Sequence, residues 1–151
     1  MGKALRKAWD KGGEEELRRI LNVREIFDRL DERKRRLNHC GMGKSFMVVD
    51  SRNRLWTCPW TVGQKGNRLG ENTALDYEQL EKYQKSQIEM NGCDSCWARF
   101  LCGGGCSFVH GSTGGKTAEK KIDFCERTRF LMAQALTYYG RSRAATAGVQ
   151  Q

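Results

Sequence analysis

Four cysteines lie close together in the second half of the 151-residue chain and could hold a metal centre. Their spacing is Cys93-x2-Cys96-x5-Cys102-x3-Cys106. Two cysteines three residues apart can bind one metal ion or two corners of one cluster, because the residues between them form a tight turn. A structural zinc site typically separates two such pairs by about 12 to 20 residues. Here the second pair follows after five residues, which favours an iron–sulfur cluster over a single zinc ion.

Three consecutive glycines, Gly103 to Gly105, lie between the last two cysteines of this group. Glycine lets the backbone approach a bulky group closely, with its N–H groups free to point at sulfide. This run therefore also favours a cuboidal cluster.

The remaining cysteines, Cys40, Cys58 and Cys125, are far from this group in the sequence. An odd total of seven leaves one thiol over in any disulfide framework, and crowded reduced cysteines are more typical of metal ligands. Seven thiolates fill one four-ligand site and leave three for a second. Three are enough to hold a four-iron cluster while one iron stays open to another ligand.

The elements that must position these cysteines begin with a cysteine-free, highly charged segment, residues 1–38. Its apolar residues recur at steps of three, four and seven, which predicts an amphipathic docking helix over 14–37, separated by Gly12-Gly13 from an earlier helical piece. The residues of this face are Ile20, Val23, Phe27, Leu30 and Leu37.

A β-hairpin is predicted over 45–58, where strand-forming residues flank Ser51-Arg52-Asn53-Arg54. Asn tolerates a left-handed backbone, so we expect a positive φ at Asn53. Residues 59–75 read as a loop, and a polar helix is expected over 76–90.

Toward the C-terminus we expect a flexible loop over 111–121, a helix over 122–139 and a disordered tail over 141–151. The fold class expected is α+β: a small irregular domain with one β-hairpin and flanking helices around two iron–sulfur clusters, preceded by an amphipathic helix.

The complete pattern resembles the seven-cysteine signature of SPASM domains, the auxiliary-cluster modules of radical S-adenosylmethionine peptide and protein maturases. It runs Cys40-x12-Asn53-x4-Cys58, a gap, the group from Cys93 to Cys106, a second gap, and Cys125. The resemblance covers residues 39–140, and Asn53 is the one departure, since the family usually has Gly there. The segment from Cys93 to Cys106 is most similar to maturases that form thioether cross-links, including the quinohemoprotein amine dehydrogenase type.

The resemblance implies a division of the ligands between two 4Fe-4S clusters. Cys40, Cys58 and Cys106 would hold the first auxiliary cluster, with one open iron. The ligands of the second would be Cys93, Cys96, Cys102 and Cys125.

The resemblance also implies a role in electron transfer or substrate binding during modification of a peptide or protein. The C-x3-C-x2-C motif of the radical core is missing from this sequence. We therefore expect no S-adenosylmethionine on this chain and no complete enzyme. The expected partner is a radical SAM core, either as a separate subunit or as a missing N-terminal barrel.

Two other functions share some of these features. A free-standing electron carrier would hold the same clusters without a catalytic partner. A zinc-binding nucleic-acid module would explain C-x2-C and the net charge of +9, but the glycine run and the seventh cysteine argue against it. Two bound clusters would also lower the net charge to about +6.

The first 16 residues carry charge where a secretory signal needs an apolar core, and no apolar run approaches the roughly 18 residues that cross a bilayer. We therefore expect a cytoplasmic protein that does not enter a membrane.

Overall fold

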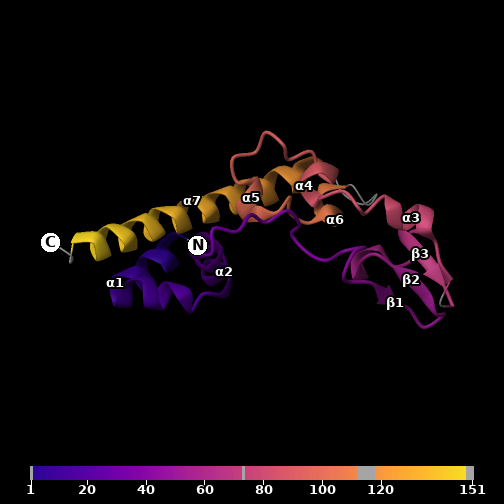
Figure 1. Cartoon of the computed structure of the whole chain (residues 1–151), viewed down its shortest axis with the longest axis horizontal. Coiled ribbons are helices and arrows are strands. Elements are labelled where there is room, and N and C mark those ends of the chain that lie inside the picture. The colour runs from indigo at the N-terminus through magenta and orange to yellow at the C-terminus, as the bar shows by residue number, and fades with distance from the viewer. Residues whose placement is uncertain (1, 73, 112–117, 149–151) are drawn as a thin grey trace. The chain divides into compact units, whose positions relative to one another are not determined.

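The computed structural model describes residues 2–72, 74–111 and 118–148 (Figure 1). These residues form seven α-helices and one four-stranded antiparallel sheet, which confirms the α+β class. The chain divides into two compact units. One comprises residues 1–35 with 126–151, and the other comprises 36–125. The C-terminal helix thus supplies residues to the same unit as the N-terminal segment.

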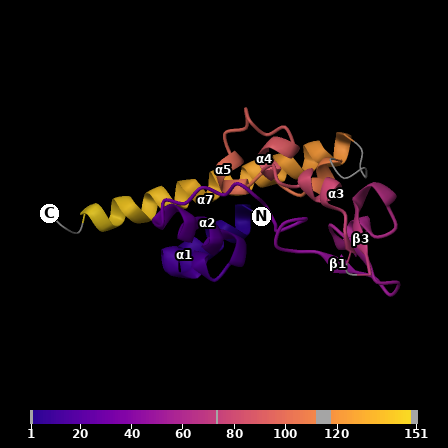
Figure 2. The ribbon, with the colours of Figure 1, turned by 45° about the vertical axis from the view of Figure 1, so that its right-hand side comes forward.

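The first unit is built from helices α1 (Gly2–Arg18) and α2 (Leu21–Asp31), which lie side by side in Figures 1 and 2, together with α7 (Ala118–Gly148) from Glu126 onward. The glycine pair interrupts α1 as expected, with non-helical backbone at Gly12 and Gly13. The buried side chains of this unit are Leu5, Leu17, Val23, Ile26, Phe27, Met132, Ala135 and Tyr138.

The single helix expected over 14–37 is wrong, because α1 ends at Arg18 and α2 ends at Asp31. Arg33 adopts a left-handed backbone (φ 54°), and the N–H of Lys34 donates to the carbonyl of Arg29 at 2.9 Å. This is the hydrogen bonding of a Schellman turn, which closes a helix without a glycine. Leu37 lies beyond the helix and is 51% exposed.

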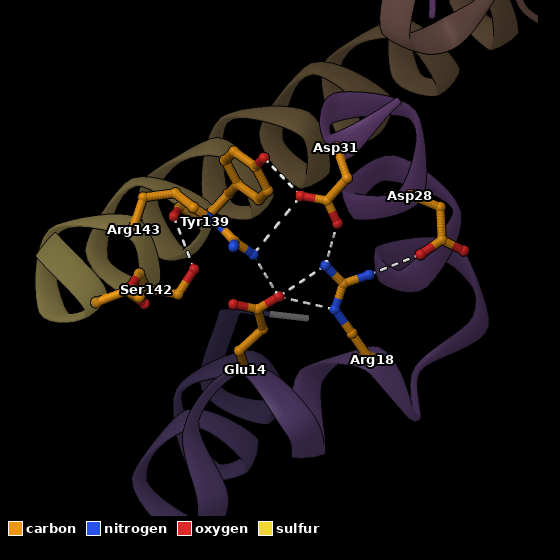
Figure 3. A network of polar contacts seen from close by, with 8 residues as sticks. Glu14, Arg18, Asp28, Asp31, Tyr139, Ser142 and Arg143 are labelled. Carbon is orange, nitrogen blue, oxygen red and sulfur yellow. Dashed lines mark hydrogen bonds and ion pairs between the residues drawn. The ribbon is translucent and has the colours of Figure 1, made fainter. Parts of the chain in front are cut away.

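Helix α7 continues to Gly148, so residues 141–148 are helical where the sequence predicted a disordered tail. Polar contacts hold this end (Figure 3): Arg143 forms ion pairs with Glu14 at 2.6 Å and Asp31 at 3.6 Å, and the Tyr139 hydroxyl donates to Asp31 at 2.7 Å. Residues 149–151 lie outside the described residues.

The second unit contains the sheet, whose strand order is β1-β2-β3-β4. Strands β1 (Val48–Val49) and β2 (Arg54–Trp56) form the predicted hairpin, with Val48 opposite Trp56. The predicted positive φ at Asn53 is confirmed at 55°.

Asp50 fastens the hairpin turn, because its carboxylate accepts hydrogen bonds from the side chains of Arg54 at 2.8 Å and Trp56 at 2.9 Å. These bonds, the Arg54 side chain first, hold the pKa of the Asp50 carboxyl well below its usual range.

The loop expected over 59–75 is wrong. It contains the 3-10 turns η1 (Pro59–Thr61) and η2 (Lys65–Asn67) and the strands β3 (Arg68–Glu71) and β4 (Ala74–Leu75). Pairing with β2 makes β3 a strand although its sequence, Arg-Leu-Gly-Glu, lacks strand formers. Its one large apolar residue, Leu69, is fully buried beside Met42 and Tyr83.

The polar helix expected over 76–90 is two short helices, α3 (Tyr77–Glu81) and α4 (Gln87–Met90). Ser86 begins α4 with a capping box: its side chain accepts from the N–H of Glu89, whose side chain accepts from the N–H of Ser86. Such a cap competes with continuation of a preceding helix.

Two more short helices, α5 (Arg99–Cys102) and α6 (Ser107–His110), precede α7, which begins earlier than the expected residue 122. Most of the flexible loop expected over 111–121 lies outside the described residues. Within the part of the chain that is described, no helix combines the length and apolarity needed to cross a bilayer.

Candidate metal centre

All seven cysteines are described, all are free thiols, and all lie in the second unit. Three precede or end short helices: Cys58 caps η1, Cys102 is the last residue of α5, and Cys106 caps α6. Cys125 lies on α7 within the second unit, and Cys93 lies three residues after the end of α4. Thus short helices and turns present most of these thiols.

Four of the thiols form one neighbourhood, which we call the four-thiol group: Cys93, Cys96, Cys102 and Cys125. Burial first, and then repulsion from the other three members, raise the pKa of Cys102 to about 11, against the opposing charge of Arg36. Charges influence each other in this way only when they lie close together. The structure therefore brings Cys125 to three cysteines that are 23 or more residues away in the sequence.

The other three thiols form a second neighbourhood, the three-thiol group: Cys40, Cys58 and Cys106. Burial raises the pKa of Cys58, and repulsion from Cys106 and Cys40 adds to this, while the backbone N–H of Trp60 donates to Cys58 and lowers it. These two neighbourhoods have the same members as the two ligand sets that the SPASM resemblance implies. The assignment of each thiol as a ligand stays a prediction.

The thiols are near one another but are not closed around a single ion. Among the described residues, no group of three or more His, Cys, Asp or Glu side chains is placed so that it could hold a metal ion as it stands.

The glycine run between Cys102 and Cys106 has the conformation that only glycine adopts easily. Gly103, Gly104 and Gly105 have φ values of 74°, 84° and 71°. A Cβ on Gly104 would lie 2.4 Å from the carbonyl carbon of Gln87, so the two backbones are in close contact. The loop is thus held against α4.

Two buried amides, Gln87 at the start of α4 and Asn91 at its C-cap, contact this loop and Cys40, and the sequence did not reveal them. Gln87 accepts from the Cys40 N–H at 3.0 Å and donates to Cys40 Sγ at 3.3 Å. Asn91 donates to the carbonyl of Gly104 at 2.8 Å. The capping box Ser86-x-x-Glu89 was visible in the sequence and could have marked this helix start.

Arg36 is the cation that acts on the four-thiol group. Its guanidinium donates to the carbonyls of Asn38 at 3.1 Å and His39 at 2.6 Å, and its backbone N–H donates to Phe100. It lowers the pKa of Cys102. A fixed positive charge here would stabilise bound thiolates.

Both histidines contact residues of the four-thiol group. The ring Nε2 of His110 lies 3.6 Å from Cys125 Sγ, and the Nδ1 of His39 lies 3.3 Å from the carbonyl oxygen of Cys102. These contacts do not favour either histidine as the fourth ligand of the three-thiol group.

An aromatic pair flanks the three-thiol group. Trp60, two residues after Cys58, stacks on Phe108, two residues after Cys106, with ring centroids 6.0 Å apart and an interplanar angle of 25°. Trp60 is 69% exposed, so its ring presents an apolar surface to solvent.

Comparison with models of known protein families finds no match to this chain, and comparison with curated proteins finds none either.

Proposed function

We propose that residues 36–125 hold two iron–sulfur clusters and serve as the auxiliary module of a radical SAM peptide or protein maturase. The observation that carries the proposal is the gathering of seven free thiols into two neighbourhoods, one of four and one of three. Four thiolates complete a four-iron cluster, and three leave one iron open. Thioether-forming maturases remain the type that the sequence from Cys93 to Cys106 favours.

The surroundings of the thiols support this proposal. Thiolate is the usual protein ligand of iron–sulfur clusters, and hydrogen bonds to the sulfurs set the properties of the cluster. The structure supplies such donors from Gln87 to Cys40 and from the Trp60 N–H to Cys58. Closure of the thiols around each cluster would accompany binding, since metal binding and folding are coupled.

The proposed module acts with a partner. This sequence has no C-x3-C-x2-C motif, and all seven cysteines are assigned to the two groups. The chain would therefore work with a radical SAM core that forms the radical, while its own clusters carry electrons or hold the peptide. When bound, a cluster with an open iron supplies a site for a peptide thiolate.

Two matched cysteine variants test the proposal. In the anaerobically reconstituted full chain, Cys96→Ala should remove or alter the electron paramagnetic resonance signal of one cluster, and Cys40→Ala should alter the other. Each variant should keep the second signal, because the two thiols belong to different groups. The division of the thiols between two clusters would be contradicted if neither variant lost a signal, or if both variants lost the same signal.

The open iron has its own test. Adding a small thiol or a cysteine-containing peptide should change the signal that Cys40→Ala affects and leave the other signal unchanged, because only three thiolates hold that cluster. If neither signal responds, the clusters are a relay or a structural core without a substrate site.

A further inference from the structure

Gln87 is an amide with only 1% of its surface exposed, and its side chain contacts one cysteine at two points. Its Oε1 accepts from the Cys40 N–H at 3.0 Å, while its Nε2 donates to Cys40 Sγ at 3.3 Å. A buried amide needs partners for both its oxygen and its nitrogen. Here Cys40 supplies both, although its own side chain is exposed.

The helix that carries Gln87 is anchored independently of the cysteines. The capping box of Ser86 and Glu89 fixes the first turn of α4, and the N–H of Gln87 donates to Asn38 Oδ1 at 3.0 Å. The amide therefore has a defined position before any cluster binds.

The same turn of helix also fixes the loop that leads to Cys106. The backbone of Gln87 lies against Gly104, and Asn91, the C-cap residue of α4, donates to the Gly104 carbonyl. Cys40 and the loop before Cys106 are thus held by one element, although they are more than 60 residues apart in the sequence.

We propose that Gln87 is a positioning residue of the three-thiol group, which orients Cys40 Sγ for ligation and raises the reduction potential of a cluster bound there. The inference rests on the proposed function. A hydrogen bond to a thiolate is stronger than one to a neutral thiol, since the acceptor is charged. Such a bond withdraws electron density from the sulfur and so favours the reduced cluster.

The variant Gln87→Glu tests this with little change in shape. It keeps an oxygen that can accept from the Cys40 N–H, but it replaces the N–H that faces the sulfur with a carboxylate oxygen. The full chain is reconstituted anaerobically. The reduction potential of each cluster is then measured by a redox titration followed by electron paramagnetic resonance. Cys40→Ala identifies the signal of the three-thiol group.

In Gln87→Glu, the reduction potential of the cluster in the three-thiol group should fall. The chain should also bind that cluster about 10–100-fold more weakly, as measured by competition with a chelator. The signal of the four-thiol group should keep its potential. The matched control is Gln84→Glu, the same chemical change on an exposed side chain of the same unit, which should alter neither potential.

A buried carboxylate could also disturb folding, so Gln87→Met provides a second variant of similar size without charge. A lowered potential confined to the three-thiol signal supports the inference. Unchanged potentials in both variants, or equal changes in both clusters, overturn it while leaving the proposed function standing. A wild-type chain that binds no cluster overturns the proposed function itself.

Discussion

At the scale of single residues, the candidate chemistry depends on whether the thiols are protonated. Burial and the neighbouring thiols disfavour the thiolate at Cys102 and at Cys58, so both have raised pKa values in the absence of metal. A metal must displace these protons to bind. The cluster-free protein therefore carries groups that folding keeps neutral.

This gives a pH dependence for the stability of the cluster-free protein. Folding raises the pKa of Cys102 from its ordinary value of 9.0 to about 11. The folded state holds this proton more tightly than the unfolded state, so stability is full below pH 9 and falls as pH rises toward 11. Urea unfolding under reducing conditions should show wild type losing about 1–2 kcal/mol more than Cys102→Ala over this window. If the free energies of unfolding of the two proteins changed with pH in the same way, the burial of this thiol would be contradicted.

Individual residues also show where sequence reasoning succeeds. Asn53 was predicted to have a positive φ because the side chain of Asn makes a left-handed backbone tolerable, and this property is local. Gln87 was not found, because its role depends on Cys40, 47 residues away in the sequence. Nothing in the local sequence shows that a polar residue on a polar helix is buried.

At the scale of elements, the loop between Cys102 and Cys106 depends on three successive left-handed residues. This conformation lets α4 approach closely and brings the two cysteines, one from each group, to the two ends of a short turn. The elements that carry the thiols are too short to be stable alone, so their contacts must define them.

The substitution Gly104→Ala should destabilise the chain by about 2–5 kcal/mol, since it adds a strained backbone to a clash with the Gln87 carbonyl carbon. Gly66→Ala is the matched control: a Cβ there meets nothing within 4 Å, so the change should stay within about 0.5 kcal/mol. Urea denaturation of both variants measures the difference. Equal effects would show that the loop does not pack closely on α4.

The elements also explain which parts of the fold the sequence could not predict. The hairpin of β1 and β2 has its own strand formers and turn, and it was predicted. Strand β3 has one large apolar residue and a glycine, so its existence depends on pairing with β2. The break before α4 depends on a cap whose sequence is short and common.

At the scale of the whole molecule, the largest ion-pair network and the thiols belong to different units. The first unit contains the ion-pair network of Figure 3, in which Arg18 contacts Glu14, Asp28 and Asp31, and it has no cysteine. The second unit contains all seven thiols. The sequence predicted a cysteine-free N-terminal segment but missed the pairing of that segment with the end of α7, which depends on long-range contacts such as Tyr139 with Asp31.

This separation predicts that damage to the network leaves the cofactor in place. Arg18→Met should cost about 1–2 kcal/mol, because it removes a half-buried cation from three carboxylates. Arg6→Met, which loses one exposed pair at 3.9 Å, should cost about 0–0.5 kcal/mol. Both variants should bind as much iron as wild type. A loss of iron in Arg18→Met alone would show that the units do not act separately.

The iron and acid-labile sulfide content of the full chain, reconstituted under anaerobic conditions, tests the central proposal most directly. Seven thiolates in groups of four and three predict about eight iron and about eight sulfide per chain. Zinc at about one or two ions per chain, with no sulfide, would contradict the proposal and identify the cysteines as ligands of single ions.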